Sequence, residues 1–287
     1  MQSALSLFDL VPGKLLEDRF LIQDTSRQGG MAAVFRVRDQ AHDEDVELQL
    51  FTASLFDTEK ERAEFAALWE RWLGVSAPTL AGLREVVELG GGLALVTDLP
   101  HGRSLRKLLD EGRSFEEAQV IELGLAMCGG LGALHGRSLA HGDVKPQTIF
   151  VDEASPNGLA PQLVDAGITS ALWTAKHLGE QTALIGTPFY APVEQFGGSA
   201  PDATSDVYNL AVVLFELLAG KLPWGGTSFL EVFQAKLAKE TPRFSMRNPE
   251  ARVSPELEAV IARGMAGARL DRFPDAVHFG AALADLA

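Results

Sequence analysis

The chain has 287 residues, 46% hydrophobic and 22% charged, a composition typical of a soluble globular protein with a sizeable core. Its formal net charge of −14 argues against nucleic acid or an anionic membrane surface as a partner, since both are themselves negative. The single cysteine, Cys128, excludes an intramolecular disulfide. Its apolar neighbours in the sequence predict a buried thiol rather than a reactive one.

The N-terminus and the longest apolar runs carry no clear targeting signal. The best run, residues 210–219, is interrupted by Glu216 and is too short to span a bilayer. Residues 1–11 lack the basic start of a signal peptide. We therefore expect a cytoplasmic protein without a membrane span.

The first hundred residues predict a small sheet and one helix, after a leader at residues 1–12. Runs bounded by turn residues predict strands at 19–23, 34–38 and 46–51, and two more within 80–99 around the glycines 90–92. The stretch from Thr58 to Glu61 matches a capping box. It would begin a helix with one apolar face, formed by Phe65, Leu68, Trp69 and Trp72.

The remaining residues predict a mainly helical region. A second capping box is expected at 114–117, beginning a helix that ends near His135. A helix from about Ser205 would end at Gly220, because glycine suits the position that follows a helix. Further helices are expected from Ser228, from Ser254, and near Pro274. The boundary between the regions falls around Asp98 to His101, which divides residues 13–99 from 100–287.

Five short motifs follow one another in the second half of the chain. They are His141-Gly142-Asp143-Val144-Lys145-Pro146, Asp165-Ala166-Gly167, residues 186–195, Ser205-Asp206-Val207-Tyr208 and Asp271-Arg272-Phe273-Pro274. In this order and spacing they resemble the motifs of bacterial eukaryotic-like Ser/Thr protein kinases. The resemblance runs from about Gly13 to the C-terminus. It implies an α+β fold with two lobes: a small antiparallel-sheet N-lobe with one helix, and a larger, mainly helical C-lobe.

Several positions keep the residues that phosphoryl transfer uses. The resemblance implies that Asp143 is the catalytic base, that Lys145 touches the transferred phosphate and that Asp165 is the main metal ligand. Asp143 has an alternative role, as a structural carboxylate that holds its loop. Structural roles are also implied for His141 in the catalytic loop and for Asp206 at the start of the central buried helix.

Other motif positions concern structure and regulation. The resemblance implies an ion pair between Glu194 and Arg272. Gly142 replaces the arginine that would bind a phosphate on the activation segment, so we expect that mode of switching to be absent. Ala166 replaces the phenylalanine of D-F-G, and we suggest that Trp72 partly fills the space left there. The alternative is that Trp72 is one more core aromatic.

Positions that would contact a nucleotide depart from the family. Gln49 stands at the strand lysine and carries no charge to neutralise phosphates. Glu47 replaces a small alanine beside adenine, where a carboxylate would be desolvated or would face the negative nucleotide. Arg27, Gly29 and Ala32 occupy the three glycine positions of the loop over the phosphates, and an ordinary hairpin turn is the alternative interpretation. The degenerate nucleotide-binding positions are Gly29, Gly30, Glu47, Gln49, Thr97 and Phe150.

The remaining departures concern the adenine floor, the second metal ligand and the helix glutamate. Phe150 replaces a medium aliphatic residue and could fill part of the adenine pocket. Thr148 replaces the metal-binding asparagine with a neutral and shorter group. Counting back from residues 77–79 places Leu68 where the family has the helix glutamate, with Glu64 and Glu70 as alternatives if the register slips.

Together these residues lead to two hypotheses. The first is a pseudokinase, which keeps the fold, lacks efficient phosphoryl transfer and acts as a signalling scaffold or regulator through a protein partner. No cofactor is expected in that case. The second is a divergent active Ser/Thr kinase, or another nucleotide-dependent transferase, that uses Asp143, Lys145 and Asp165 with ATP and Mg²⁺. Arg27 is then the nearest basic residue that could replace the missing lysine.

Overall fold

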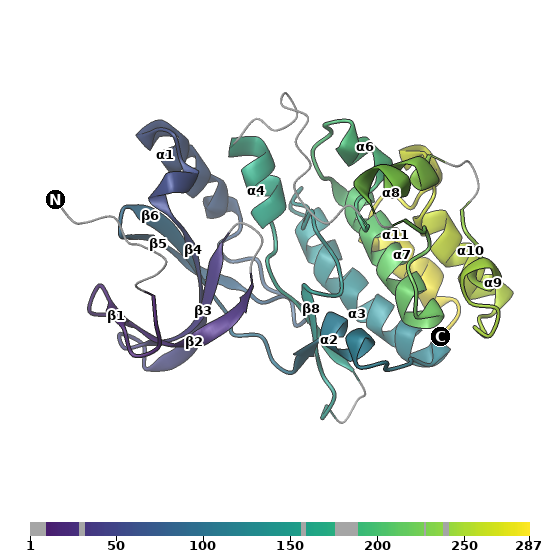
Figure 1. Ribbon diagram of the computed structural model, residues 1–287, viewed down its shortest axis with the longest axis horizontal. Coiled ribbons are helices and arrows are strands. Elements are labelled where there is room, and N and C mark those ends of the chain that lie inside the picture. The colour runs from purple at the N-terminus through teal and green to yellow at the C-terminus, as the bar shows by residue number, and fades with distance from the viewer. Residues whose placement is uncertain (1–9, 29–31, 156–158, 176–188, 227, 238–240) are drawn as a thin grey trace. The chain divides into compact units, whose positions relative to one another are not determined.

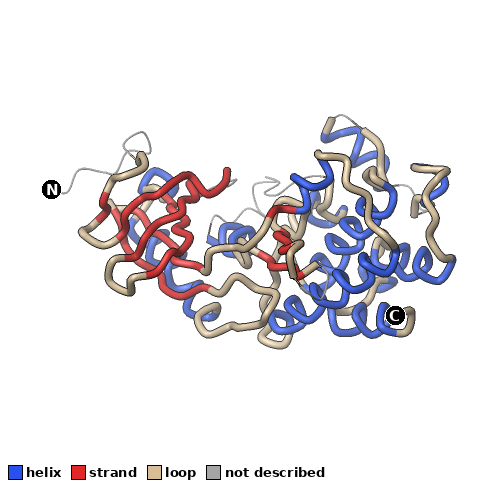
Figure 2. The backbone as a smooth tube through the Cα atoms, turned by 90° about the horizontal axis from the view of Figure 1, so that it is seen from below, coloured by secondary structure: helices blue, strands red, loops and turns tan. Residues whose placement is uncertain are grey.

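The structure is a computed structural model that describes residues 10–28, 32–155, 159–175, 189–226, 228–237 and 241–287 (Figure 1). The chain forms two compact units, Met1–Ser76 with Ala81–Pro100, and Ala77–Leu80 with His101–Ala287. Strands dominate the first unit and helices the second, as Figure 2 shows, which gives the expected α+β fold. Residues 77–80 were predicted to belong to the N-lobe but group with the second unit, because Leu80 bridges to Leu163 and the Thr79 carbonyl accepts from Leu163 N.

The N-terminal unit contains an antiparallel six-stranded sheet in the order β1-β2-β3-β4-β6-β5. Its strands are β1 Leu15–Leu16, β2 Phe20–Gln28, β3 Ala33–Asp39, β4 Glu44–Phe51, β5 Leu83–Leu89 and β6 Gly92–Thr97. Every strand predicted in this region is found. The short strand β1 was not predicted, because two residues carry no measurable alternation.

Strand β4 has two different faces because successive side chains of a strand point to opposite sides. Val46, Leu48 and Leu50 belong to the hydrophobic core of this unit. The other face carries Glu47, Gln49 and Phe51, in that order along the strand, all at most 1% exposed. A strand that buries both faces therefore holds a carboxylate and an amide beside an aromatic ring.

Helix α1, Glu59–Leu68, packs on the second of these faces. Its Phe65 ring meets Phe51 at 5.1 Å between centroids and Trp69 at 5.7 Å. Thr58 caps the helix by accepting from Glu61 N, as predicted, but the Glu61 carboxylate accepts from Asp57 N rather than from Thr58. A short 3-10 helix, η3 Trp69–Arg71, continues α1.

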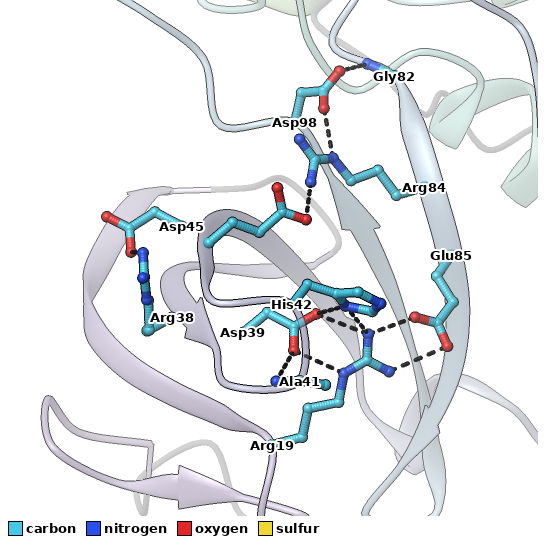
Figure 3. A network of polar contacts seen from close by, with 11 residues as sticks. Arg19, Arg38, Asp39, Ala41, His42, Asp45, Gly82, Arg84, Glu85 and Asp98 are labelled. Carbon is cyan, nitrogen blue, oxygen red and sulfur yellow. Dashed lines mark hydrogen bonds and ion pairs between the residues drawn. The ribbon is translucent and has the colours of Figure 1, made fainter.

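A polar network closes one end of this sheet (Figure 3). Arg19 donates to both carboxylate oxygens of Asp39, at 3.0 and 2.8 Å, and to both of Glu85, at 3.2 and 2.7 Å. His42 Nδ1 lies 2.8 Å from Asp39 Oδ2. The hydrogen bonds from Arg19 hold the pKa of the buried Asp39 carboxyl well below its usual range. The network joins β3, β5 and the residue that precedes β2.

The C-terminal unit is mainly helical and includes a three-stranded sheet in the order β7-β8-β9. The strands are β7 Arg103–Ser104, β8 Ile149–Asp152 and β9 Ala160–Leu163. The helices are α2 Leu105–Asp110, α3 Glu117–His135, α4 Ile168–Ala175, α6 Val193–Phe196, α7 Ala203–Ala219, α8 Phe229–Lys236, α9 Phe244–Arg247, α10 Pro255–Gly264 and α11 Ala276–Ala284. Helix α7 is buried along nearly its whole length and packs against α3, α10 and α11.

Helix boundaries follow local capping chemistry in most cases. Gly220 ends α7 with φ of 67°, and Ser228 and Ser254 cap α8 and α10, as predicted. The helix expected from Ser205 begins two residues earlier, because Asp202 caps it. The capping box predicted at 114–117 is wrong. The N-cap is Glu116, whose backbone N–H donates to Gln119 Oε1 at 3.1 Å.

Among the described residues one helix, α3, is long and apolar enough to cross a membrane, judged by its length and composition alone. Half of its most apolar segment is buried inside the protein, as in the core helix of a globular domain. The sequence analysis considered residues 210–219 and did not single out α3. Cys128 lies buried in α3, and burial raises the pKa of its thiol to about 12.

Candidate functional site

The catalytic loop is held by the side chain of Asp206, near the start of α7. Asp206 is fully buried and accepts from the backbone N–H groups of His141 and Gly142 at 2.7 and 2.8 Å. His135 Nε2 lies 3.0 Å from the same carboxylate, while His135 Nδ1 accepts from Ala276 N. The imidazole of His135 therefore donates to Asp206 through Nε2. The structural roles predicted for His141 and Asp206 agree with these contacts.

Asp143 and Lys145 face each other within the loop. Lys145 Nζ donates to Asp143 Oδ2 at 2.5 Å, and both side chains are partly accessible, 18% for Lys145 and 17% for Asp143. Asp143 N donates to His141 Nδ1 at 3.1 Å, which orients the loop toward the buried histidine. His141 Nε2 in turn lies 2.8 Å from the carbonyl of Val164, so this nitrogen donates. A carboxylate and an ammonium group are thus placed side by side on a fixed loop.

Thr148 closes the loop and is 2% exposed. Its hydroxyl accepts from Lys145 N at 3.1 Å, and it lies 3.0 Å from the Lys145 carbonyl and 3.2 Å from the Asp143 carbonyl. A hydroxyl has one proton and two lone pairs, so these contacts commit its donor and one acceptor to the loop itself. The structure therefore gives Thr148 a role in loop geometry.

The residues on either side of Asp165 are hydrogen-bonded to this loop. Val164 N donates to the Thr148 carbonyl at 2.9 Å, and Gly167 N donates to the His141 carbonyl at 3.3 Å. Asp165 has φ of 63°, a left-handed conformation that few residues other than glycine adopt. The structure thus brings together the four positions predicted for transfer chemistry in this unit: Asp143, Lys145, Thr148 and Asp165.

Helix α4 begins three residues after Asp165 and lies against the catalytic loop. Ser170 Oγ donates to the Ala140 carbonyl at 3.0 Å. Gly142 has φ of 87°, and a Cβ added there would lie 2.7 Å from Ser170 Oγ and 3.2 Å from Pro201 Cβ. A residue with a Cβ at position 142 would therefore need the Ser170 side chain to move. No local sequence pattern predicts this contact, because Gly142 and Ser170 are far apart in the chain.

The ion pair predicted between Glu194 and Arg272 is present. Arg272 Nη1 and Nη2 donate to the two Glu194 oxygens at 2.6 and 3.0 Å, and Arg269 Nε adds a third bond at 3.1 Å. The Arg272 side chain is fully buried. Burial acts to raise the pKa of Glu194, but the bonds from Arg272 and Arg269 outweigh it and leave that pKa below its ordinary value.

The N-terminal unit holds Glu47, Gln49 and Thr97, three of the positions predicted to contact the nucleotide. Gln49 Nε2 donates to Glu47 Oε1 at 3.1 Å on β4, and both side chains are buried. Thr97 on β6 pairs directly with Glu47 across the sheet and is also buried. A buried carboxylate and a neutral amide hydrogen-bonded to each other thus occupy the strand where the family carries a small residue and a lysine.

At the positions considered for the helix glutamate, namely Leu68, Glu64 and Glu70, no carboxylate is buried against the pair of Glu47 and Gln49. The buried positions of helix α1 are Phe65 and, in η3, Trp69. Glu64 is exposed and lies 3.7 Å from Lys60 on the same helix, and Glu70 is exposed as well. Leu68, the position obtained by counting, is partly exposed. Neither alternative glutamate faces the sheet.

The remaining predicted positions divide between described and undescribed parts of the chain. Gly29 and Gly30 lie outside the described residues, as does the side chain of Arg27. Phe150, on β8, is partly exposed and pairs with Gln162 of β9. Trp72 is 6% exposed in the N-terminal unit and lies 6.0 Å from the Trp69 ring. Its suggested contact with the space beside Ala166 joins the two units and stays a prediction.

Magnesium would need oxygen ligands near Asp165. Asp165 offers a carboxylate, but the Thr148 hydroxyl is buried and engaged by the loop, so it does not fit as a second ligand. In the part of the chain that the structure describes, no three acidic, histidine or cysteine side chains gather as a metal cluster. Of the two predicted metal positions, Asp165 supplies a carboxylate and Thr148 a buried neutral hydroxyl.

Comparison with known proteins gives the family. A protein kinase domain model matches residues 27–272. The chain is 29% identical over 279 residues to the serine/threonine-protein kinase PknL of Mycobacterium tuberculosis, covering 97% of this chain and 68% of PknL. It is 27% identical over 275 residues to the serine/threonine-protein kinase pkn3 of Myxococcus xanthus, covering 94% of this chain but half of pkn3.

A solved structure shows the same fold. The crystal structure of the Mycobacterium tuberculosis PknI kinase domain superposes with a TM-score of 0.73 at 20% sequence identity, covering 97% of this chain and all of that one. The match extends over both units, and the family model alone spans most of the sequence. The chain therefore belongs to the protein kinase family.

Proposed function

We propose that this chain is a pseudokinase that regulates or scaffolds a signalling protein through direct binding. The observation that carries the proposal is Gln49, a buried neutral amide hydrogen-bonded to a buried carboxylate at the position of the strand lysine. Phosphoryl transfer depends on positioned positive charge, because charge on the phosphate oxygens must be neutralised in the transition state. Glu47 beside Gln49 is a second departure from the family on this strand and supplies no positive charge either.

The residues at the predicted metal positions support the same proposal. Only Asp165 offers a carboxylate at the predicted metal positions, and the Thr148 hydroxyl serves its own loop. Each missing catalytic contact reduces the rate by roughly 10²-fold or more, so several together leave little activity. Binding to another protein requires the fold alone, and the fold is intact.

An active Ser/Thr kinase is the second candidate, and the comparisons taken alone favour it. The relatives that match along the chain are named serine/threonine-protein kinases. Asp143 and Lys145 are paired at 2.5 Å on an ordered loop, and Asp165 is retained. On this alternative ATP and Mg²⁺ would be the cofactor and metal, and a basic residue from elsewhere would replace the strand lysine.

Nucleotide binding separates the two candidates. We would measure the melting temperature of the purified chain with and without Mg²⁺-ATP, and radiolabel transfer to a generic basic protein substrate. The pseudokinase proposal expects no shift at millimolar ATP and no transfer. A Glu47→Ala/Gln49→Lys double variant, which restores the family residues, is expected to gain a nucleotide-dependent rise in melting temperature.

The controls are variants of the catalytic lobe. Transfer by the wild-type chain that disappears in both Asp143→Ala and Asp165→Ala would reject the pseudokinase and establish the active kinase. Transfer that persists in both variants would come from a contaminating enzyme. A nucleotide-dependent rise in melting temperature without phosphate transfer would be consistent with a regulatory role. It would show that the chain still binds nucleotide.

A further inference from the structure

Lys236, the last residue of α8, is buried to 3% exposure in the C-terminal unit. Its ammonium group donates to the carbonyl oxygens of Phe189 and Ala191 at 2.9 and 2.6 Å. Both acceptors are neutral backbone groups 47 and 45 residues away in the chain. No motif of the sequence pointed to this lysine.

Aromatic rings surround the same ammonium group. Nζ lies 5.2 Å from the ring centroid of Tyr208 and 5.1 Å from that of Trp224, and these two rings stack on each other. A third ring, Phe196 of α6, lies 5.9 Å away. Rings at these distances attract a cation through their negative faces, and more strongly where water is excluded. The two carbonyl acceptors and the three aromatic rings are therefore placed to stabilise a positive charge on Lys236.

The segment 189–191 is held along its whole length by side chains. Between the two carbonyls that Lys236 binds, the Tyr190 carbonyl accepts from Asn209 Nδ2 at 2.8 Å. Tyr190 Oη donates to Glu216 Oε2 at 2.6 Å. The segment lies in neither a helix nor a strand. Side-chain donors from α7 and α8 therefore replace the backbone hydrogen bonds that regular structure would supply.

A buried ammonium is costly for the fold. Burial lowers the pKa of Lys236 well below its ordinary value; Arg272 lowers it further, and Glu194 acts in the opposite direction. An apolar side chain of similar length would avoid this cost, because replacing buried charges by well-packed apolar groups is often neutral or stabilising. The charge at position 236 thus has a role other than global stability.

We propose that Lys236 is a positioning residue, whose charge fixes the segment 189–191 in one conformation against α7 and α8. The inference concerns the order of this segment and does not depend on whether the chain transfers phosphate. It predicts that removing the charge while keeping the bulk loosens the segment and leaves the rest of the unit intact.

The test compares Lys236→Met with a matched control, Lys221→Met, which makes the same change at an exposed lysine. Backbone hydrogen exchange is measured by mass spectrometry on the full chain, together with the melting temperature. In Lys236→Met we expect exchange in peptides covering 189–191 to rise about 10-fold or more, because charge-assisted hydrogen bonds are lost. The melting temperature is expected to stay unchanged or to rise. The control should change neither quantity.

Two outcomes of this experiment would overturn the proposal. Unchanged exchange at 189–191 in Lys236→Met would show that the charge does not hold the segment. Faster exchange throughout the C-terminal unit with a lower melting temperature would show that Lys236 is a general core residue.

A second measurement covers the case in which Lys236→Met fails to fold. In wild-type protein labelled with ¹⁵N-lysine, a caged ammonium should give an Nζ resonance protected from solvent exchange at neutral pH. Its assignment follows from its persistence in Lys145→Met, which removes the lysine ion pair, Lys145 with Asp143, that the structure describes in this unit. The absence of any protected resonance in that variant would reject a charged, positioning Lys236.

Discussion

The two units treat their family charges differently. In the C-terminal unit Asp206, Glu194 and Arg272 keep their residues and their partners, with bonds of 2.6 to 3.0 Å. In the N-terminal unit the position predicted for the strand lysine holds Gln49, and the two glutamates considered as its partner, Glu64 and Glu70, are exposed. The difference shows which charges the architecture requires. In the C-terminal unit, buried charged side chains form hydrogen bonds that hold backbone segments in place. In the N-terminal sheet, the neutral amide of Gln49 is accommodated at the position predicted for a charged lysine.

The largest effect is expected from Asp206→Ala. The substitution leaves two backbone N–H groups and the His135 imidazole without their acceptor in a fully buried place. We expect the free energy of unfolding to fall by about 3 kcal/mol or more. Urea denaturation followed by the fluorescence of Trp173 and Trp224 measures it. Asp206→Asn keeps one acceptor oxygen, so its free energy of unfolding should fall distinctly less than that of Asp206→Ala. Equal losses in the two variants would contradict the role of Asp206 as a hydrogen-bond acceptor.

Arg272→Met is expected to have the next largest effect, since it leaves Glu194 buried without its main partner. A loss of about 3 kcal/mol is expected, as for other broken buried ion pairs. The measurement is a double-mutant cycle with Glu194→Gln. The double variant should be more stable than the sum of the two single losses predicts. Simple additivity would mean that the two side chains do not act as a pair.

Gln49→Leu tests the other side of the comparison. It removes the bond from Gln49 Nε2 to Glu47 but adds no clash, because leucine is close in size. We expect a loss of about 1 kcal/mol, smaller than either loss in the C-terminal unit. Fluorescence of Trp69 and Trp72 reports unfolding of this unit. A loss as large as that of Asp206→Ala would break the proposed difference between the units.

The pH dependence of the N-terminal unit should come in part from Asp39. Because hydrogen bonds from Arg19 lower its pKa in the folded state, Asp39 contributes stability above its ordinary value of 3.8. That contribution is lost as the pH falls from 3.8 toward the lower folded-state pKa. Arg19→Met should therefore lose less stability between pH 7 and pH 3 than the wild type. An equal acid dependence would show that Asp39 is not responsible.

The smallest effect concerns Cys128. Its thiol is buried and its pKa is raised to about 12, so the reactive thiolate is scarce at neutral pH. Alkylation by iodoacetamide at pH 8 should be very slow in the native chain and fast in urea, as measured by mass spectrometry. Fast labelling of the native protein would contradict the buried position in α3.

Local features were predictable from sequence where one segment contains all the partners. Ser228 and Ser254 cap helices through N–H groups three residues away, and Gly220 ends α7 through its own backbone. The helix start near 114–117 was misplaced because acidic and hydroxyl residues both suit an N-cap, and only the fold decides which is used.

Contacts between distant segments were predictable only where the family motifs supplied them. The pair of Glu194 and Arg272 was inferred in this way and is present. Lys236 was not found, because its partners lie 45 and 47 residues away and no local pattern marks them. The loop contacts of the Thr148 hydroxyl were not predicted for a similar reason: they depend on where two carbonyl groups of its own loop point.

Gly142 has a consequence for how this sequence can change over time. Any residue with a Cβ at this position must adopt φ of 87°, and its Cβ would lie 2.7 Å from Ser170 Oγ and 3.2 Å from Pro201 Cβ. A variant at position 142 therefore carries backbone strain and also needs the Ser170 side chain to move. Reversion of Gly142 to the family arginine is expected to be easier to accommodate in a Ser170→Ala background, where that oxygen is gone.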